Sequence, residues 1–325
     1  MKNDCSIYIP VCLRESISRD RLGLRFLRKK PGSLLFLDIS GFTGMTEKLM
    51  LTGREGSEEL TFLINRYFDQ VINVIYHYGG DIIKFGGDAL LCYFKGLDSY
   101  NLALQSVDRV MRLMKRGYGR VRTSAGKFVL SVHCGISEGE FWECSVGKEG
   151  EQLEYIIFGD SVRKAIKLAE GVAANEVGVE RSLYDKIVNI FKYEAIERGY
   201  IIKLRELKVG KEVRRREDIG DTDEYLLFDV EQFIPKYIRE HIRRADYIGE
   251  HRRVIVCFLE LRSAYDLLMN IRNERSGDEI DSYFVEVMSQ IYADIARILE
   301  NYEGTYLKTD ISANGEKIIY LFGRL

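Results

Sequence analysis

An internal repeat narrows the folds open to this chain more than any other feature of its sequence. An apolar strand-like run, a helical stretch and a glycine-led second strand occur twice. The interval from Asp38 to Lys84 in the first copy is 46 residues, and that from Glu260 to Lys308 in the second is 48. Two halves that keep register this closely predict a duplicated structural unit. Because the second copy, 251–325, stops soon after its hairpin, we expect it to be incomplete.

The first copy has the pattern of a mixed α and β domain. Its apolar run at 33–37 is typical of a buried strand, which ends at Asp38. Apolar residues at helical spacing then predict a long helix that begins with Ser57 as its N-cap and ends before a glycine pair. Residues 81–94 predict a β-hairpin with a glycine turn.

The remaining elements complete a recognisable plan. We expect a helix at 98–116, strands at 128–135 and 153–158, and a helix at 160–170. This order predicts an α+β fold, a ferredoxin-like βαββαβ domain followed by the truncated second copy. The expected boundaries are an N-terminal segment at 1–30, a first domain at 31–207, a linker with a helix near 231–245 at 208–250, and the incomplete second domain at 251–325.

Charge and composition exclude several classes of protein. The 48 basic and 50 acidic side chains leave a net charge of −2, so no nucleic-acid partner is expected. The charged stretches at 208–218 and 239–244 are interpreted as solvated surface, with docking on the first domain as the alternative for 239–244. No apolar run is long enough for a membrane span. The six cysteines form no Cys-x-x-Cys pair and the amino terminus has no signal-peptide core. We therefore expect a reduced, cytoplasmic protein.

Two aspartates carry the chemistry that the pattern suggests. Asp38 ends a strand and precedes a glycine turn whose amides would open the next helix, an arrangement suited to anions. Asp88 follows the glycine pair of the hairpin, which neighbours the first strand in the expected order. Two facing carboxylates beside such a turn are what two Mg²⁺ ions and a triphosphate need. The simpler alternative is that each aspartate only caps a turn.

At these residues the sequence resembles a known family. The two segments that carry the resemblance are Phe36-Leu37-Asp38-Ile39-Ser40-Gly41-Phe42-Thr43 and Lys84-Phe85-Gly86-Gly87-Asp88-Ala89-Leu90-Leu91. They are similar to the metal-binding motifs of class III adenylyl and guanylyl cyclases, in the soluble, bicarbonate-responsive adenylyl cyclase branch. The resemblance covers 31–207 and the start of a second domain at 251–325. It implies an active site between two domains, where the 3′-hydroxyl of ATP attacks the α-phosphate and yields cyclic AMP and pyrophosphate.

The resemblance also implies roles for individual residues. Asp38 and Asp88 would hold two Mg²⁺ ions, with Mn²⁺ as a substitute, and the Ile39 carbonyl would add a ligand. Residues expected to contact the nucleotide are Asp38, Ile39, Ser40, Gly41, Phe42, Thr43, Asp88, His133 and Lys308, the last reading adenine. Lys84 and Ile157 would be a remnant of a bicarbonate site. His133 is equally well read as a hydrogen-bonded strand histidine, and Lys84 as a charge paired near the aspartates.

Several positions depart from the family pattern. Glu260 and Ser312 stand where the second domain would need metal-binding aspartates. Arg163 and Lys167 stand where two-site cyclases carry an Asn and an Arg, Ile156 stands at their adenine acceptor, and Ile166 stands at the bicarbonate-site arginine. The chain thus lacks the arginine that stabilises the transition state. We expect a homo- or heterodimeric partner cyclase domain, although a symmetric homodimer of first domains should be poor at catalysis. Full activity would need a partner chain or a longer version of this chain that brings the arginine, or Arg163 and Lys167 in its place.

Two other functions remain open from the sequence. A non-catalytic pseudo-cyclase that binds nucleotide and pairs with a competent domain would explain the incomplete second copy. A diguanylate-type cyclase or a polymerase palm shares the Gly-Gly-Asp hairpin, but such folds lack the repeated strand-to-lysine interval.

Overall fold

The computed structural model describes residues 8–19, 23–96, 99–188, 191–198, 201–209, 230–244, 254–275, 279–312 and 315–323. They form two compact units, each built from separate stretches of sequence. Unit 1 takes in residues 1–30, 140–163 and 219–325, and unit 2 takes in residues 31–139 and 164–218. These boundaries differ from the predicted domains, because residues 140–163 share a core with residues near the carboxyl end of the chain.

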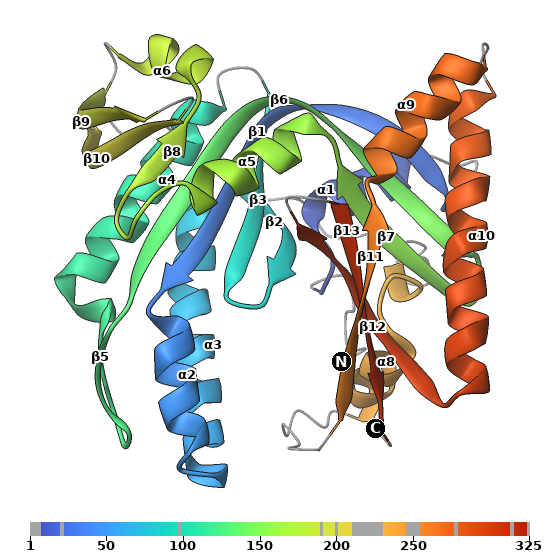
Figure 1. Cartoon of the computed structure of the whole chain (residues 1–325), viewed down its shortest axis with the longest axis horizontal. Coiled ribbons are helices and arrows are strands. Elements are labelled where there is room, and N and C mark those ends of the chain that lie inside the picture. Colours follow the sequence, from blue (N-terminus) through green and yellow to red (C-terminus); the bar gives the residue numbers. More distant parts are fainter. Residues whose placement is uncertain are drawn as a thin grey trace. The chain divides into compact units, whose positions relative to one another are not determined.

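Unit 2 contains the predicted βαββαβ plan (Figure 1). Its elements are β1 (Phe26–Ser40), α2 (Phe42–Met50), α3 (Arg54–His77), β2 (Gly80–Gly86), β3 (Ala89–Lys95), α4 (Tyr100–Leu113), a π-helical turn (Met114–Tyr118), β4 (Arg120–Thr123), β5 (Gly126–Val129), β6 (Ser131–Lys148), α5 (Asp160–Glu170), β8 (Val177–Val179), α6 (Arg181–Ile187), β9 (Phe191–Arg198) and β10 (Ile201–Val209). Parts of β1, β6 and α5 belong to unit 1. The strand order is β2-β3-β1-β6-β8-β10-β9. Its first four strands have the ferredoxin-like order, so the predicted α+β fold is confirmed.

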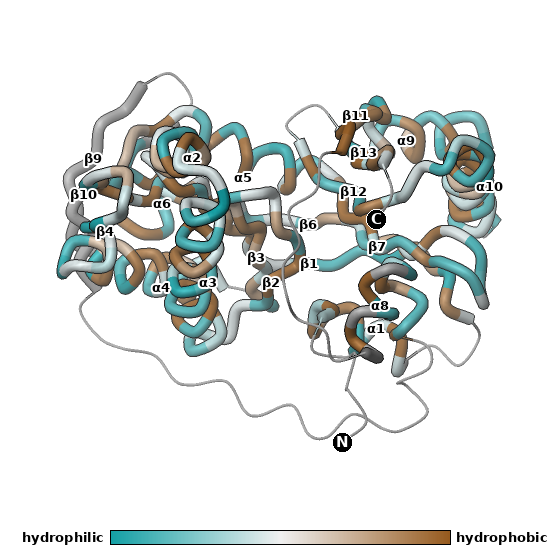
Figure 2. The backbone as a smooth tube through the Cα atoms, turned by 90° about the horizontal axis from the view of Figure 1, so that it is seen from below, coloured by the Kyte–Doolittle hydropathy of each residue, from teal (hydrophilic) through white to brown (hydrophobic). Residues whose placement is uncertain are grey.

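The core of unit 2 holds β1 rigidly. Leu34, Leu35 and Leu37 of β1 are fully buried, as expected of a central strand covered on both faces. Helix α3 packs on the sheet through residues at helical spacing, including Val71 and Ile75. In Figure 2 the helices of this unit carry both hydrophobic (brown) and hydrophilic (teal) segments. The packing of β1 therefore fixes the position of the residues at its carboxyl end.

Two local predictions for unit 2 were wrong. Ser57 is not an N-cap, because Gly53 turns the chain with φ 75° and α3 begins at the next residue. The predicted strand at 128–135 is split, because the short hairpin β4–β5 ends at Val129 and β6 begins at Ser131. The helix predicted at 98–116 is confirmed as α4 and the π-helical turn that continues it, in which Gly117 has φ 140°.

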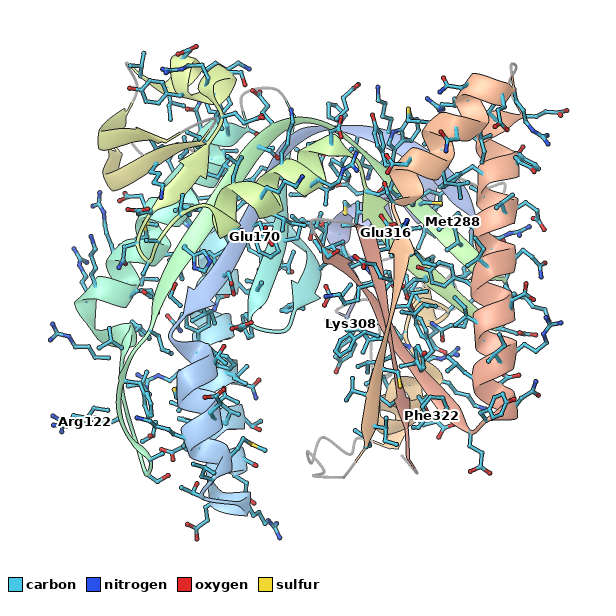
Figure 3. All side chains as sticks on the ribbon, viewed as in Figure 1. Arg122, Glu170, Met288, Lys308, Glu316 and Phe322 are labelled. Atoms are coloured by element: carbon cyan, nitrogen blue, oxygen red, sulfur yellow. The ribbon has the colours of Figure 1, made fainter. Side chains whose placement is uncertain are left out.

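Unit 1 has its own core. Its elements are α1 (Val11–Arg19), β7 (Gln152–Phe158), α8 (Lys236–Arg244), β11 (Ile255–Arg262), α9 (Ala264–Glu274), α10 (Ile280–Asn301), β12 (Gly304–Ser312) and β13 (Gly315–Phe322). Trp142 and Phe158 from the middle of the chain pack with Phe284 and Met288 of α10 in one hydrophobic cluster. Figure 3 shows Met288 on the face of α10 that is turned toward the strands. A helix that contributes Phe284 and Met288 therefore completes a core begun by β6 and β7.

The C-terminal sheet follows the same order of elements as the first half of unit 2. The strand order β11-β13-β12 parallels β1-β3-β2, and two helices again lie between the first two strands in sequence. A register shift directly precedes the lysine in both hairpins, between Ile82 and Lys84 and between Tyr306 and Lys308. The lysines of the two hairpins therefore occupy matching positions, as the repeat predicted.

Several sequence predictions concern other described regions. The linker helix predicted near 231–245 is α8, which begins after Pro235, and Arg239 on it donates to the Glu151 carbonyl oxygen rather than being only solvated. Residues 210–218 of the charged stretch lie outside the described residues. The five cysteines in the described part of the chain are free. None of the described helices is both long and apolar enough to cross a bilayer.

Candidate functional site

Asp38 and Asp88 meet at one end of the unit 2 sheet. Asp38 lies near the end of β1, and Asp88 lies in the turn between β2 and β3. Strands β1 and β3 pair with Leu37 opposite Leu90, so continuing the register by one residue puts Asp38 beside Ala89. Asp88 directly precedes Ala89. The pairing of two neighbouring strands thus brings together the two carboxylates that the sequence singled out.

The electrostatics of Asp88 show that the two carboxylates interact. Partial burial raises the pKa of Asp88, and the negative charge of Asp38 raises it further. A hydrogen bond from its own backbone and the neighbouring His133 act in the opposite direction. A carboxylate whose charged form is disfavoured by another carboxylate is stabilised when a cation binds between them.

His133 lies beside Asp38 on β6, the strand that neighbours β1 on the side opposite to β3. Strand β6 neighbours β1 in the sheet, and His133 Nε2 lies 3.4 Å from Asp38 Oδ2. Its Nδ1 lies 2.8 Å from Ser40 Oγ. Because a carboxylate only accepts, Nε2 is the nitrogen that carries the proton toward Asp38, and Ser40 donates to Nδ1 in the neutral ring. Both ring nitrogens therefore have partners, which favours the strand-histidine reading over a free phosphate contact.

The turn after Asp38 has the backbone that an anion site needs. Gly41 precedes α2 with φ 90°, a left-handed conformation suited to glycine, and Phe42 begins the nine-residue helix. The Ile39 amide donates to Asp38 Oδ1 at 2.8 Å. Phe42 packs against the core of unit 2, while Thr43 is exposed. The first backbone N–H groups of α2, like those of any helix, have no carbonyl acceptor within the helix. Together with the positive end of the helix dipole, they favour an anion there.

Gly41→Ala tests this turn. A Cβ at position 41 would lie 2.7 Å from the Val129 carbonyl oxygen, in a backbone conformation that alanine disfavours. We expect a loss of about 1–3 kcal/mol in the free energy of unfolding, measured by urea denaturation.

Gly44→Ala is the matched control, because Gly44 lies within α2 and a Cβ there would meet nothing within 4 Å. It should raise stability by up to about 1 kcal/mol through helix propensity. Equal effects of the two substitutions would contradict the assigned role of Gly41.

The other predicted site residues are distributed over both units. Lys84 is half-buried on β2 in unit 2, whereas Ile157 is buried on β7 in unit 1. Lys308 lies on β12 in unit 1, with its Nζ 3.0 Å from Asp310 Oδ2. The nucleotide contact of Lys308 and the bicarbonate-site remnant stay predictions.

The residues that depart from the family pattern are also placed. Arg163 is tied to Asp160 at 2.8 Å and to Asp266 at 3.7 Å, and its guanidinium lies over the Tyr265 ring. Lys167 is exposed on α5. Ile156 and Ile166 are buried hydrophobic residues. Arg163 is thus engaged within unit 1.

Sequence analysis missed Glu316, which occupies a position comparable to Asp88. Lys308 pairs with Ile319 as Lys84 pairs with Leu91, so counting back along β13 puts Glu316 at the position that corresponds to Asp88. Counting along β12 instead leads to Ser312, the residue expected from the sequence, because the second hairpin is longer.

Glu316 is nevertheless part of the framework of unit 1. It is buried and accepts a 2.8 Å hydrogen bond from the Ala264 amide at the start of α9. Burial raises its pKa. Figure 3 shows Glu316 on β13 and Lys308 on β12. Aligning the repeat on the second hairpin strand would have revealed this carboxyl group.

The donor set at the end of β1 fits magnesium. No group of three or more histidine, cysteine, aspartate or glutamate side chains that could hold a metal occurs in the described part of the chain. Two carboxylates and a backbone carbonyl are hard oxygen ligands. Mg²⁺ usually binds through one or two carboxylates together with water and substrate phosphates. Asp38 and Asp88, with the Ile39 carbonyl, therefore suit Mg²⁺ or Mn²⁺.

Comparison with known proteins extends these observations. A model of the adenylate and guanylate cyclase catalytic domain matches residues 27–216. Adenylate cyclase type 10 is 29% identical over 167 residues in Homo sapiens and 32% identical over 160 residues in Oryctolagus cuniculus. The matched segments cover 49% and 47% of this chain, but only 9% of either relative. The adenylyl cyclase CyaB from P. aeruginosa superposes with a TM-score of 0.43 at 22% identity, over 60% of this chain and 99% of that structure.

The family model covers more than half of the chain and includes both aspartates at the end of the sheet. The two relatives named above are adenylate cyclases, in agreement with the resemblance of the two motifs to the soluble adenylyl cyclase branch. The chain therefore belongs to the adenylate and guanylate cyclase catalytic domain family.

Proposed function

We propose that this protein is an adenylyl cyclase that converts ATP to 3′,5′-cyclic AMP and pyrophosphate for signalling in the cytoplasm. The observation that carries the proposal is the strand register that puts Asp38 opposite Ala89, directly after Asp88, beside the turn that opens α2. The similarity to adenylate cyclases type 10 favours ATP over GTP as the substrate.

Different residues of unit 2 would have different roles in the reaction. Asp38, Asp88 and the Ile39 carbonyl would hold two Mg²⁺ ions, which lower the pKa of the 3′-hydroxyl and neutralise phosphate charge. The glycine turn and the first amides of α2 would bind triphosphate oxygens. The new bond joins O3′ to the α-phosphorus, the bond to the bridging β-phosphate oxygen breaks, and the hydroxyl proton passes to water. His133 would position Asp38 through its contact with Oδ2.

A second domain would complete the site. We propose that residues 251–325 are the start of a second cyclase domain, supported by the matching strand order and by the register shift before Lys308. In that arrangement Lys308 would read adenine. Since Arg163 is held by Asp160 and Asp266, the full rate would need an arginine from the partner domain of a heterodimer, because a second copy of this chain lacks it too. The chain alone would turn over slowly.

Product formation tests the proposal directly. The chain is incubated with ATP or GTP and with Mg²⁺ or Mn²⁺, and cyclic nucleotides are quantified by mass spectrometry. We expect cyclic AMP from ATP, with more product in Mn²⁺. Cyclic GMP as the main product would overturn the assigned substrate.

The second candidate is a nucleotide-binding pseudo-cyclase. It is favoured by the engagement of Arg163 within its own unit. Addition of a separately purified cyclase domain that carries the missing arginine distinguishes the two. Under this candidate, metal-dependent ATP binding persists while no cyclic AMP forms without the added domain.

Asp88→Asn should separate stability from metal binding. Because the folded-state pKa of Asp88 is raised above 3.8, its ionisation lowers stability as the pH rises through that pKa. The asparagine variant should therefore have a higher melting temperature without metal at neutral pH, and less loss of stability between acid and neutral pH. It should also lose the increase in melting temperature that Mn²⁺ gives the wild type.

Differential scanning fluorimetry with and without Mn²⁺ measures both effects. The control is Asp185→Asn, which removes an exposed carboxylate on α6 in the same unit. A full Mn²⁺ response in Asp88→Asn would contradict the metal role of Asp88.

A further inference from the structure

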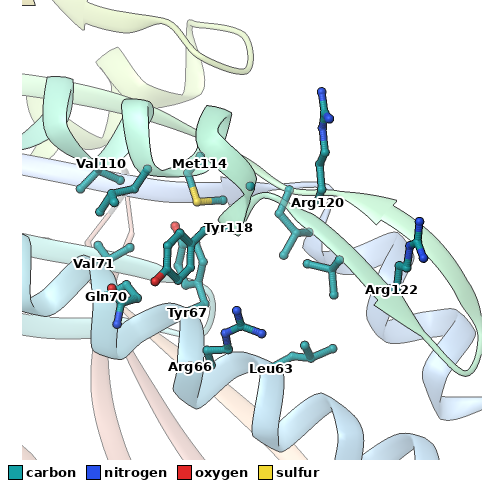
Figure 4. A pocket seen from close by; sticks show the side chains of 14 residues that line it. Leu63, Arg66, Tyr67, Gln70, Val71, Val110, Met114, Tyr118, Arg120 and Arg122 are labelled. Carbon is teal, nitrogen blue, oxygen red and sulfur yellow. The ribbon is translucent and has the colours of Figure 1, made fainter.

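A cavity in unit 2 lies apart from the aspartate site, between α3, the end of α4 and β4 (Figure 4). It measures about 100 Å³, enough for several water molecules. Leu63, Val71, Val110 and Met114 give it an apolar wall. The π-helical turn forms one side, and such turns are frequent at functional sites.

Tyr67 contributes a polar group that has no partner. Its side chain is 7% exposed and lines the cavity, and its hydroxyl makes no hydrogen bond in the described part of the chain. A buried hydroxyl without a partner is unfavourable relative to one that is hydrogen-bonded. Tyr67 is therefore an available donor for a ligand that enters the cavity.

The charges around the cavity are all positive. Among the residues that line it, three are arginines and none is acidic. Arg66 stands on α3 with its guanidinium 5.6 Å from the centre of the Tyr118 ring, and both side chains face the cavity in Figure 4. Arg120 and Arg122 rise from β4 at its edge, and neither forms an ion pair within the described residues. The local potential therefore attracts anions.

We propose that this cavity binds a small carboxylate with an apolar body. The planar guanidinium of Arg66 matches a carboxylate through two parallel hydrogen bonds, and the Tyr67 hydroxyl can donate a third. The aliphatic wall accommodates an apolar ring or branched chain. The volume is too small for a nucleotide, so this ligand is distinct from the proposed substrate.

The test measures binding to the whole chain by isothermal titration calorimetry at low salt, with phenylacetate as the probe. Its neutral counterpart is 2-phenylethanol. We expect phenylacetate to bind with a dissociation constant on the order of a millimolar, as its size allows. The alcohol should bind at least about tenfold more weakly, because it lacks the charge that Arg66 pairs.

Three variants locate the site. Arg66→Gln should weaken phenylacetate binding by about tenfold and Tyr67→Phe by about threefold. Arg116→Gln removes the same charge from an exposed arginine of the π-helical turn that does not line the cavity, and should bind as the wild type does. Tyr67→Phe should keep or raise the melting temperature, since the hydroxyl it removes has no partner.

Three results would overturn the proposal. The first is no phenylacetate binding by the wild type, which would leave the cavity to water alone. The second is equal binding of phenylacetate and 2-phenylethanol. The third is equal loss in Arg66→Gln and Arg116→Gln. None of these readouts depends on cyclase activity, so they stand whether or not cyclic AMP is formed.

Discussion

Asp38→Ala is expected to lower the rate of cyclic AMP formation by about three orders of magnitude, equivalent to about 4 kcal/mol of transition-state stabilisation. The carboxylate lies where β1, the β2–β3 turn and β6 converge, and it contacts His133. Its removal would leave Asp88 without the second acidic ligand that metal binding requires. The measurement is initial rate with saturating ATP and Mn²⁺.

The melting temperature of Asp38→Ala shows whether a lower rate reflects loss of folding or loss of catalysis. Removing one of two repelling carboxylates should leave the metal-free melting temperature unchanged or raised. The control is Asp185→Ala, which deletes an exposed aspartate on α6 and should keep the wild-type rate. If Asp38→Ala retained a tenth or more of the activity, Asp38 would not be a metal ligand.

Phe284→Ala is expected to destabilise unit 1 by about 3–5 kcal/mol, because it empties a fully buried aromatic site. The Phe284 ring lies 5.5 Å from that of Phe158 on β7. Urea denaturation gives the free energy of unfolding, and hydrogen exchange shows where protection is lost. We expect β7 and α10 to lose protection together.

Ile298→Ala on the same helix is the control, since Ile298 is 54% exposed and its loss should change stability by less than about 0.5 kcal/mol. Unchanged protection of the β7 amides in Phe284→Ala would show that residues 140–163 do not depend on α10. That result would contradict a shared core of β7 and α10.

Local patterns were enough to locate the two aspartates. The apolar run before Asp38 and the glycine pair before Asp88 determine a strand end and a tight hairpin, and both depend on neighbours in sequence. The helix at 160–170 was also predicted with its observed limits, because its apolar face and its flanking glycines are local signals. The order of these elements then implied which strands are neighbours.

Contacts between distant segments were not predictable in the same way. The unpartnered hydroxyl of Tyr67 and the capping role of Glu316 depend on which side chains pack across elements, and periodicity does not encode that. The apolar residues of β6 and β7 looked like core, but nothing in their spacing assigns them to the core completed by α10.

The division of β6 between two cores has a consequence for synthesis on the ribosome. Val132 and Cys134 belong to the core of unit 2, whose buried residues extend along the chain to Leu204. Trp142 and Cys144 belong to a core that includes Phe284, much later in the sequence. At about 5–20 residues per second, the native partners of Trp142 on α10 emerge several seconds or more after it. During that time one end of a single strand can fold while the other exposes aromatic surface, so we expect chaperone binding to nascent chains to concentrate at the Trp142 end.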